Sequence, residues 1–293
     1  MRIAALALAC LLILPAAAHA QAYGDAEVRA AANAAGFGNI ADRAAAVARA
    51  TVLVRRRVLR RAPLALGTSR LGGNPDLPAG TPWPVCGRRR QTFLGQFRLA
   101  DLPAEASELG GHGGVLLVFT EVRFASRSAS AHGLWAGRCT TLVHAPEGSL
   151  LARIRPPRAA AVMRLRPAAL RYSARADVPD VAMDYATLAA PLGDILLVDS
   201  EVDRWWDLRW ALHRRTGVLE HRLLGYVDTP NRENACWRRT ERPVGAWRHI
   251  VTIGLDFGIG FEVADAGRLQ VEIAEEDLAA GRFDRVCGIF DSA

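Results

Sequence analysis

Three short segments occur twice in this chain, in the same order, and this repetition restricts the fold more than any other feature. In each copy a turn-like segment containing Asp precedes an apolar run, and a second apolar run starts just after a Gly. The paired segments are 71–78 with 224–230, 93–97 with 253–257, and 114–119 with 267–273. Their first residues are separated by 153, 160 and 153 positions. This near-constant separation predicts two related halves produced by duplication.

Each half is predicted to consist mainly of antiparallel sheet. Gly, Pro and Asp in the repeated segments supply turn chemistry, and the Phe- and Val-rich runs are typical of strands. A few helices are also expected. Two short ones fit the Ala-rich segment 25–50 on either side of Gly36, a Trp-bearing helix fits 200–217, and a short helix fits 275–280. The fold class is therefore α+β, with two duplicated halves and an N-terminal helical extension.

The first twenty residues are typical of a cleaved secretory signal. Arg2 is followed by an almost unbroken apolar run over 3–17 and by Ala-His-Ala, a small-x-small cleavage site that ends at Ala20. The mature chain is expected to begin at Gln21 and to be periplasmic or secreted. The run is shorter than the roughly 20 residues of a membrane span, so no transmembrane segment is expected in the mature chain. A lipoprotein anchored through Cys10 is the alternative.

Four cysteines remain after the expected cleavage. They are Cys86, Cys139, Cys236 and Cys287. An even number of cysteines in an oxidising compartment favours disulfides, but four cysteines allow three pairings and the sequence does not choose among them. Buried free thiols are the alternative. Because no Cys-x-x-Cys spacing occurs, a zinc ribbon or a thioredoxin-like motif is not expected.

All 37 basic residues are arginine, and the formal net charge is +7. The absence of lysine excludes Schiff-base lysines, Ser-x-x-Lys acylation pairs and the phosphate-loop lysine. Arginine binds phosphate and carboxylate in a bidentate manner. We nevertheless expect most of these arginines to be solvated at the ends of helices and strands, and we expect no nucleic-acid partner.

No catalytic or metal-binding motif stands out. The mature chain has six histidines, and none has His-x-His or His-Glu-x-x-His spacing, so each is expected to lie at the surface or to cap an element. His221 is singled out as a hydrogen-bonding residue beside the Gly225 turn. A Gly-x-Ser-x-Gly motif is also absent. Neither a metal, a cofactor nor a catalytic residue is predicted, and an enzymatic role is the less favoured possibility.

Several segments together resemble the YwqG-like proteins, a bacterial domain family of unknown function. The segments are 69–78 (Ser-Arg-Leu-Gly-Gly-Asn-Pro-Asp-Leu-Pro), 83–84, 93–97, 101–103, 221–226, 255–256, 265–269 and 276–278. The resemblance covers 52–293, with pseudo-repeats at about 52–160 and 195–293, after a signal peptide at 1–20 and a helical extension at 21–51. It implies curved antiparallel sheets and transfers no catalytic residue. Val227 replaces the family's proline, and the signal and cysteines imply an exported branch.

The repeated and family-like segments supply the candidate ligand contacts. These are Asp76, Trp83, Gln96, Tyr226, Asp228, Asp256 and Asp265. The favoured function is a non-enzymatic binding or interaction protein of the cell envelope, immunity-like in one version, with an unidentified protein or small molecule bound between the halves. The alternative is a hydrolase of cell-wall or carbohydrate substrates that uses paired carboxylates.

Overall fold

The computed structural model describes ten segments of the chain. They are residues 24–58, 64–122, 135–137, 139–158, 163–179, 199–213, 221–228, 236, 246–263 and 267–291. The expected signal peptide with its cleavage site at Ala20 and Gln21, and the candidate Asp265, lie outside the described residues. Among the described residues, no helix is long and apolar enough to cross a membrane.

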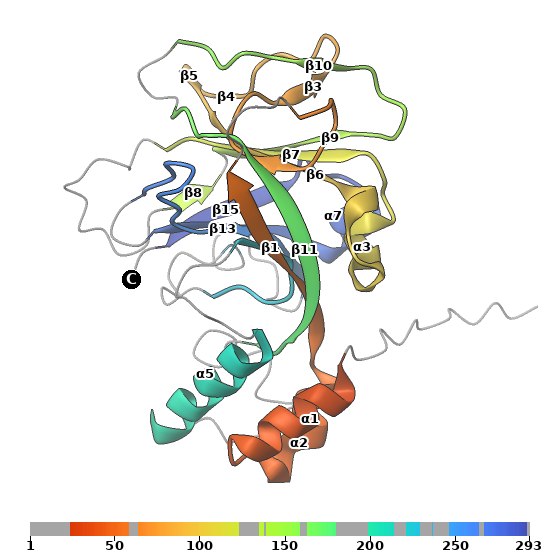
Figure 1. The fold of residues 1–293 in the computed structure, drawn as a ribbon, viewed down its shortest axis with the longest axis vertical. Helices are drawn as coiled ribbons and strands as arrows, with labels where there is room; N and C mark the ends of the chain where they lie inside the picture. The colour runs from red at the N-terminus through yellow and green to blue at the C-terminus, as the bar shows by residue number, and fades with distance from the viewer. Residues whose placement is uncertain are drawn as a thin grey trace, which may run out of the picture.

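Eleven described strands form one sheet in which every neighbouring pair is antiparallel. The order is β8-β15-β14-β13-β12-β1-β11-β2-β6-β7-β9. The strands are β1 (Arg49–Val58), β2 (Arg70–Leu71), β6 (Thr92–Arg98), β7 (Val115–Thr120), β8 (Trp135–Gly137), β9 (Thr140–Ala145), β11 (Ala168–Asp177), β12 (His221–Leu224), β13 (Trp247–Ile253), β14 (Arg268–Ala274) and β15 (Val286–Asp291). Two small antiparallel pairs, β3 (Asp76–Pro78) with β10 (Leu151–Arg153) and β4 (Val85–Cys86) with β5 (Arg89–Arg90), lie at one end of the molecule (Figure 1).

The strand order supports two duplicated halves, because ten of the eleven strands lie symmetrically about the long central pair β1–β11; the additional strand β8 pairs with the outer side of β15. Strands β2, β6, β7 and β9 follow on one side of this pair, and β12, β13, β14 and β15 follow on the other. The two halves exchange their first strands. Strand β1, the first of the N-terminal half, pairs with β12 of the C-terminal half, and β11, the first of the C-terminal half, pairs with β2 of the N-terminal half. In this topology the second half starts at β11, earlier in the chain than the approximate start at 195.

The register of the sheet corrects one of the three sequence matches. If Gly114 and Gly267 are equivalent, then Leu116 corresponds to Leu269. Phe97 faces Leu116 and Ile253 faces Leu269, so Phe97 corresponds to Ile253. The match of 93–97 with 253–257 is therefore wrong by four residues. Residues 256–261 lie beyond β13, in a turn that is closed by the bridge between Asp256 and Phe261.

The sheet curls strongly around a core that both halves share. The largest apolar cluster combines residues of both halves, including Leu116 and Phe97 with Leu269 and Ile253. At the far ends of the sheet, β15 approaches β9 so closely that a Cβ at Gly288 would lie 2.0 Å from Thr140 Oγ1. Glycine is required there because the two strands leave no room for a side chain.

The helical extension forms a second core at the opposite end from the small strand pairs (Figure 1). Helices α1 (Asp25–Ala34) and α2 (Ala41–Ala46), joined by the 3-10 turn η1 (Gly38–Ile40), pack with α5 (Asp199–His213). As expected, the two short helices lie on either side of Gly36, whose φ is +83°. Trp205 of α5 is fully buried; it packs edge-to-face on Phe37 and belongs to an apolar cluster that also includes Ala176 of β11.

The remaining short elements lie along the first half and near the C-terminus. They are the 3-10 turns η2 (Leu99–Asp101) and η3 (Ala104–Ala106) and the helices α3 (Ser107–Gly110) and α7 (Glu275–Ala279). Helices α3 and α7 contact each other, although they come from different halves. Helix α7 agrees with the short helix expected at 275–280.

The four cysteines form two disulfides, Cys86–Cys139 and Cys236–Cys287. Each bond connects a segment that follows the Asp-containing turn of its half to the start of the last large strand of that half, β9 or β15. The structure thereby selects one of the three pairings that the sequence left open.

Candidate functional site

The pattern Arg-Leu-x-Gly-x-x-Asp occurs once in each half and organises the polar interior. Arg70 precedes Asp76 by six positions, and Arg222 precedes Asp228 by six. Between them the backbone makes the same turn, with positive φ at Gly72 and Gly73 in the first half and at positions 224 and 225 in the second. The equivalent residues are thus 152 positions apart, one fewer than the sequence match of 71 with 224 indicates.

In the first half two arginines, one from β2 and one from β10, bind the aspartate that ends the turn. Asp76 is fully buried, and its Oδ1 accepts from Arg70 Nη2 at 2.8 Å and from Arg153 Nε at 2.8 Å. Gln96 Nε2 donates to Asp76 Oδ2 at 3.0 Å, while Gln96 Oε1 accepts from the Asp76 backbone N–H at 2.9 Å. Burial by itself raises the pKa of Asp76, but the hydrogen bonds from Arg153 and Arg70 outweigh it and lower this pKa to about 2.

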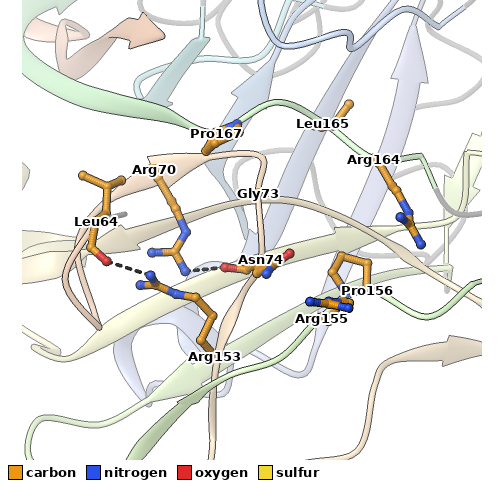
Figure 2. A pocket seen from close by; sticks show the side chains of 10 residues that line it. All are labelled: Leu64, Arg70, Gly73, Asn74, Arg153, Arg155, Pro156, Arg164, Leu165 and Pro167. Carbon is orange, nitrogen blue, oxygen red and sulfur yellow. Dashed lines mark hydrogen bonds between the residues drawn. The ribbon is translucent and has the colours of Figure 1, made fainter. Parts of the chain in front are cut away.

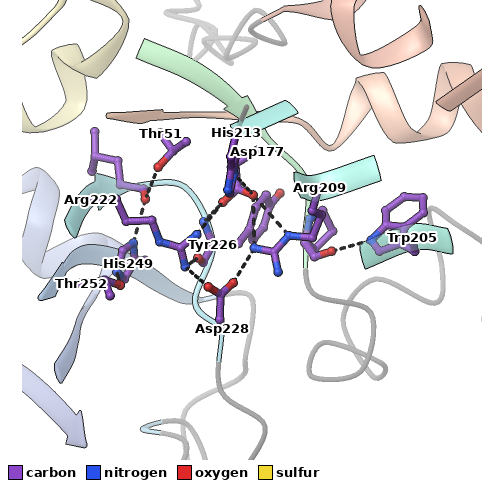
Figure 3. A network of polar contacts seen from close by, with 12 residues as sticks. Thr51, Asp177, Trp205, Arg209, His213, Arg222, Tyr226, Asp228, His249 and Thr252 are labelled. Carbon is purple, nitrogen blue, oxygen red and sulfur yellow. Dashed lines mark hydrogen bonds and ion pairs between the residues drawn. The ribbon is translucent and has the colours of Figure 1, made fainter. Parts of the chain in front are cut away.

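In the second half the corresponding aspartate is part of a larger buried network (Figure 3). Asp228 Oδ2 lies 3.0 Å from Arg222 Nη2, and Asp228 Oδ1 lies 2.7 Å from Nη2 of Arg209, a residue of α5. As in the first half, a glutamine amide oxygen, here from Gln270, accepts from the aspartate's backbone N–H. The candidate Tyr226 lies in the turn, with its hydroxyl donating to the Val47 carbonyl.

A second carboxylate, Asp177 at the end of β11, completes this network. It is fully buried, and its Oδ2 accepts from the Tyr226 backbone N–H at 2.7 Å. Its Oδ1 lies 2.9 Å from His213 Nε2 and 3.2 Å from Arg209 Nη2. Burial opposes ionisation, but the charges of Arg209 and His213 together with the hydrogen bond to His213 hold the pKa of Asp177 well below its usual range.

The two copies of the turn differ in what lies beside Nη1 of the arginine that starts the turn, which is Arg70 in the first half and Arg222 in the second. Arg222 Nη1 faces Asp177 Oδ2 at 3.8 Å. Arg70 instead lines a cavity of about 410 Å³. Among the described residues neither Nη1 has a hydrogen-bond partner, but only that of Arg222 faces a carboxylate. The first half is therefore an open version of an arrangement that the second half fills with a carboxylate.

The open cavity is strongly basic. Figure 2 shows Arg70 and Arg153 on one side of Asn74 and Arg155 and Arg164 on the other. Asp76 balances part of the charge of the first two arginines, whereas Arg155 and Arg164 are exposed and no carboxylate of the described residues pairs with them. The rest of the wall is Leu64, Gly73, Pro156, Leu165 and Pro167. Such a wall suits a small anion, because its charge would be held between arginines at the edge of a low-dielectric core.

The other candidate residues lie apart from this cavity. Asp256 accepts from Arg56 and from His221 Nε2, the latter at 2.9 Å, so the expected hydrogen bond of His221 is confirmed. Burial raises the pKa of Asp256, but the hydrogen bonds from His221 and Arg56 lower it well below its usual range. Trp83 packs edge-to-face on Phe119 and donates its Nε1–H to the Gln91 carbonyl. The structure thus brings Asp76 together with Gln96, and Tyr226 together with Asp228.

Two sequence-based interpretations are wrong for residues of these networks. Arg70, Arg209 and Arg222 are almost completely buried in ion pairs rather than solvated. His213 and His249 are also buried, although surface or capping positions were expected. The signal that identifies Arg70 and Arg222 is the repeated pattern Arg-Leu-x-Gly-x-x-Asp.

His249 provides a pH-dependent prediction. Burial, reinforced by the charge of Arg222, lowers its pKa to about 3, so the neutral ring donates Nδ1–H to the Leu224 carbonyl and accepts from Thr252 at Nε2. The unfolded chain protonates this histidine near pH 6.5 and the folded chain does not. The free energy of unfolding is therefore expected to fall as pH drops from about 6.5, by up to about 1.4 kcal/mol per pH unit.

Urea unfolding at pH 7 and pH 5 measures this effect in a range above the titration of Asp76. The His249→Gln variant is expected to lose the corresponding part of the pH dependence, whereas His112→Gln, which changes a half-buried histidine in contact with Phe283, is expected to keep it. Equal slopes for the wild type and His249→Gln would show that this histidine is not kept neutral by the fold.

One group of described residues has the spacing of metal ligands, namely Cys86, Glu121 and Cys139. The two cysteines are bonded to each other, so their sulfurs are not thiolate ligands. This group is accordingly explained by the disulfide.

Comparison with known proteins gives one result. A family model described as "Domain of unknown function (DUF1963)" matches residues 69–291, which include both turn motifs and both disulfides. No curated protein matches the chain.

Proposed function

The chain belongs to the DUF1963 family, a domain of unknown function, and on this premise we propose that it is a non-enzymatic binding protein whose cavity beside Arg70 takes up a small anionic ligand. The observation that carries the proposal is the composition of the cavity wall, which includes four arginines and no acidic residue among the residues that line it. Asp76 pairs with two of the arginines from outside the wall. The other two arginines are exposed at the opening and have no carboxylate partner among the described residues.

The compartment that we propose is the cell envelope, to which the cleaved signal at 1–20 directs the chain. We also propose that the chain represents an exported branch of the YwqG-like proteins. The two disulfides support an oxidising compartment. In that setting the cavity would meet soluble small anions rather than nucleic acid.

The carboxylate-dependent hydrolase is less well supported. It requires two facing acids, one of them protonated so that it donates to the leaving group. Asp76, Asp228 and Asp256 are each bound to arginine, and the pKa values of Asp76 and Asp256 are lowered, which keeps both groups ionised. These three aspartates suit fixed structural charges better than a general acid.

The proposal is tested by ligand-dependent thermal stability of the disulfide-bonded chain from Gln21 onward. A panel of small anions is compared with neutral and cationic compounds of similar size. At a ligand concentration about 100 times Kd, binding adds about 2.7 kcal/mol of stability, which gives a shift in Tm of several degrees. The Arg155→Gln/Arg164→Gln double variant is expected to lose this shift.

The matched control is Arg88→Gln/Arg90→Gln, which removes two exposed arginines from the segment that includes β5, away from the cavity wall. It is expected to keep the shift. If both double variants respond like the wild type, or if no anion raises Tm, the cavity is not an anion site and the proposed function is wrong.

A further inference from the structure

The second half of the molecule shows how the turn motif holds an acidic group. Asp177 places its carboxylate against the Arg222 guanidinium and accepts from the Tyr226 backbone N–H. The approach is close, since a Cβ at Gly225 would lie 2.6 Å from Asp177 Oδ2. A glycine in the turn is thus part of the binding arrangement, because any side chain would displace the carboxylate.

The same groups are present in the first half, atom for atom. Arg70 Nη2 donates to the Asn74 carbonyl and contacts Asp76, as Arg222 Nη2 does with the Tyr226 carbonyl and Asp228. Arg70 Nη1 then corresponds to the nitrogen that faces Asp177, and the Asn74 backbone N–H corresponds to the donor of Tyr226. Among the described residues neither Arg70 Nη1 nor the Asn74 N–H has a hydrogen-bond partner. Arg222 Nη1 also lacks one, but it forms an ion pair with Asp177 at 3.8 Å.

Each copy has one arginine more than it has aspartates, but only the second copy places an additional carboxylate against its turn arginine. In the second half, Arg209, Arg222 and Arg268 share two buried aspartates, Asp177 and Asp228. In the first half, Arg70 and Arg153 share one aspartate, Asp76. A carboxylate bound beside Arg70 would take the place that Asp177 has beside Arg222, and it would neutralise the excess positive charge of the first half.

The far wall of the cavity adds a requirement for a second acidic group. Arg155 and Arg164 are exposed there, opposite Arg70 and Arg153 (Figure 2). A monocarboxylate held at Arg70 would leave both of them with solvent alone, whereas a ligand with a carboxylate at each end would contact both walls.

We propose that the ligand of this cavity is a small dicarboxylate, one end of which binds Arg70 and the Asn74 N–H as Asp177 binds Arg222 and the Tyr226 N–H, while the other end binds Arg155 and Arg164. This inference rests on the proposed function and narrows it to one chemical class. Phosphate and sulfate share the negative charge but not the planar shape of the carboxylate that the second half places with one oxygen, Asp177 Oδ2, beside both Arg222 and the Tyr226 N–H.

Isothermal titration calorimetry of the disulfide-bonded chain from Gln21 onward, at low ionic strength, tests this inference. The probes are succinate, glutarate and adipate, compared with acetate, inorganic phosphate and sulfate. At least one dicarboxylate is expected to bind at one site per chain, about tenfold or more tightly than acetate, phosphate or sulfate. Arg164→Gln and Arg155→Gln are each expected to weaken that dicarboxylate about tenfold and to leave acetate nearly unchanged, and the control Arg88→Gln is expected to change neither.

The anchored end has its own readout in ¹⁵N-labelled protein. The amide resonance of Asn74 is expected to shift on dicarboxylate addition, while that of Tyr226, whose N–H already donates to Asp177, is expected to stay in place. An unmoved Asn74 amide in a protein that binds the dicarboxylate would overturn the pose.

The remaining outcomes separate the inference from the proposed function. Tighter binding of phosphate or sulfate than of every dicarboxylate would overturn the dicarboxylate assignment and leave the anion-binding function standing. No binding of any of the six anions would overturn both.

Discussion

Replacing Asp177 with alanine is expected to lower the free energy of unfolding by about 3–5 kcal/mol, because the change leaves Arg209 and Arg222 close together in the core with one carboxylate fewer between them. The Tyr226 backbone N–H loses its acceptor in the same change. An uncompensated buried charge costs far more than the ion pair contributes, since guanidinium groups removed from water need partners to offset their desolvation.

Urea unfolding at pH 7, with both disulfides intact, measures this loss. Asp42→Ala is the matched control, because Asp42 also pairs with an arginine, Arg29, but its side chain is 89% exposed. It is expected to cost less than about 1 kcal/mol. If the two variants lose similar stability, the Asp177 network is not the buried ionic centre described above.

Removing the Cys236–Cys287 bond by a double change to serine is expected to cost about 4 kcal/mol of unfolding free energy. The two cysteines are 51 residues apart, and in the chain-entropy model a loop of this length restricts the unfolded chain by that amount at 25 °C. Cys86 and Cys139 are 53 residues apart, so opening that bond is expected to cost nearly the same.

Chemical denaturation of each double variant, compared with the oxidised wild type, gives these two values. Intact mass before and after reduction verifies the starting material, since two bonds correspond to a gain of four hydrogens. A loss below about 1 kcal/mol for either variant would mean that its bond does not constrain the unfolded chain, or is replaced by other contacts. Because the two loops are so similar in length, a large difference between the variants would point to native contacts rather than loop entropy.

Much of the fold was accessible from the sequence. The repeated segments predicted two halves, the Ala-rich stretch around Gly36 predicted two short helices, and strand-like runs predicted antiparallel sheet. The exchange of β1 and β11 between the halves was not predictable, because strand pairing depends on contacts between residues far apart in the chain. Val54, for example, lies between Tyr172 and His221. No local pattern specifies such partners.

The site was predicted in part. Asp76, Gln96, Tyr226 and Asp228 were selected from the repeated segments, and they belong to the two matching networks. Their arginine partners were missed because a chain without lysine contains arginine everywhere, so composition gave no reason to select Arg70 or Arg222. Asp177 was missed for another reason: it reaches the second turn only through the exchange of β11, and its own sequence neighbours carry no motif.

The strand exchange also determines the order in which the chain becomes able to fold. Strand β1 leaves the ribosome early, but both of its neighbours, β11 and β12, are made much later. The first half can build β6, β7 and β9 in the meantime, while β2 still lacks its outer partner. During this interval the open edges of β1 and β2 are available to other chains, and contacts of such long sequence separation form slowly. A chaperone that covers these edges until β11 has been made would therefore benefit this protein more than it would benefit a protein whose two halves fold separately.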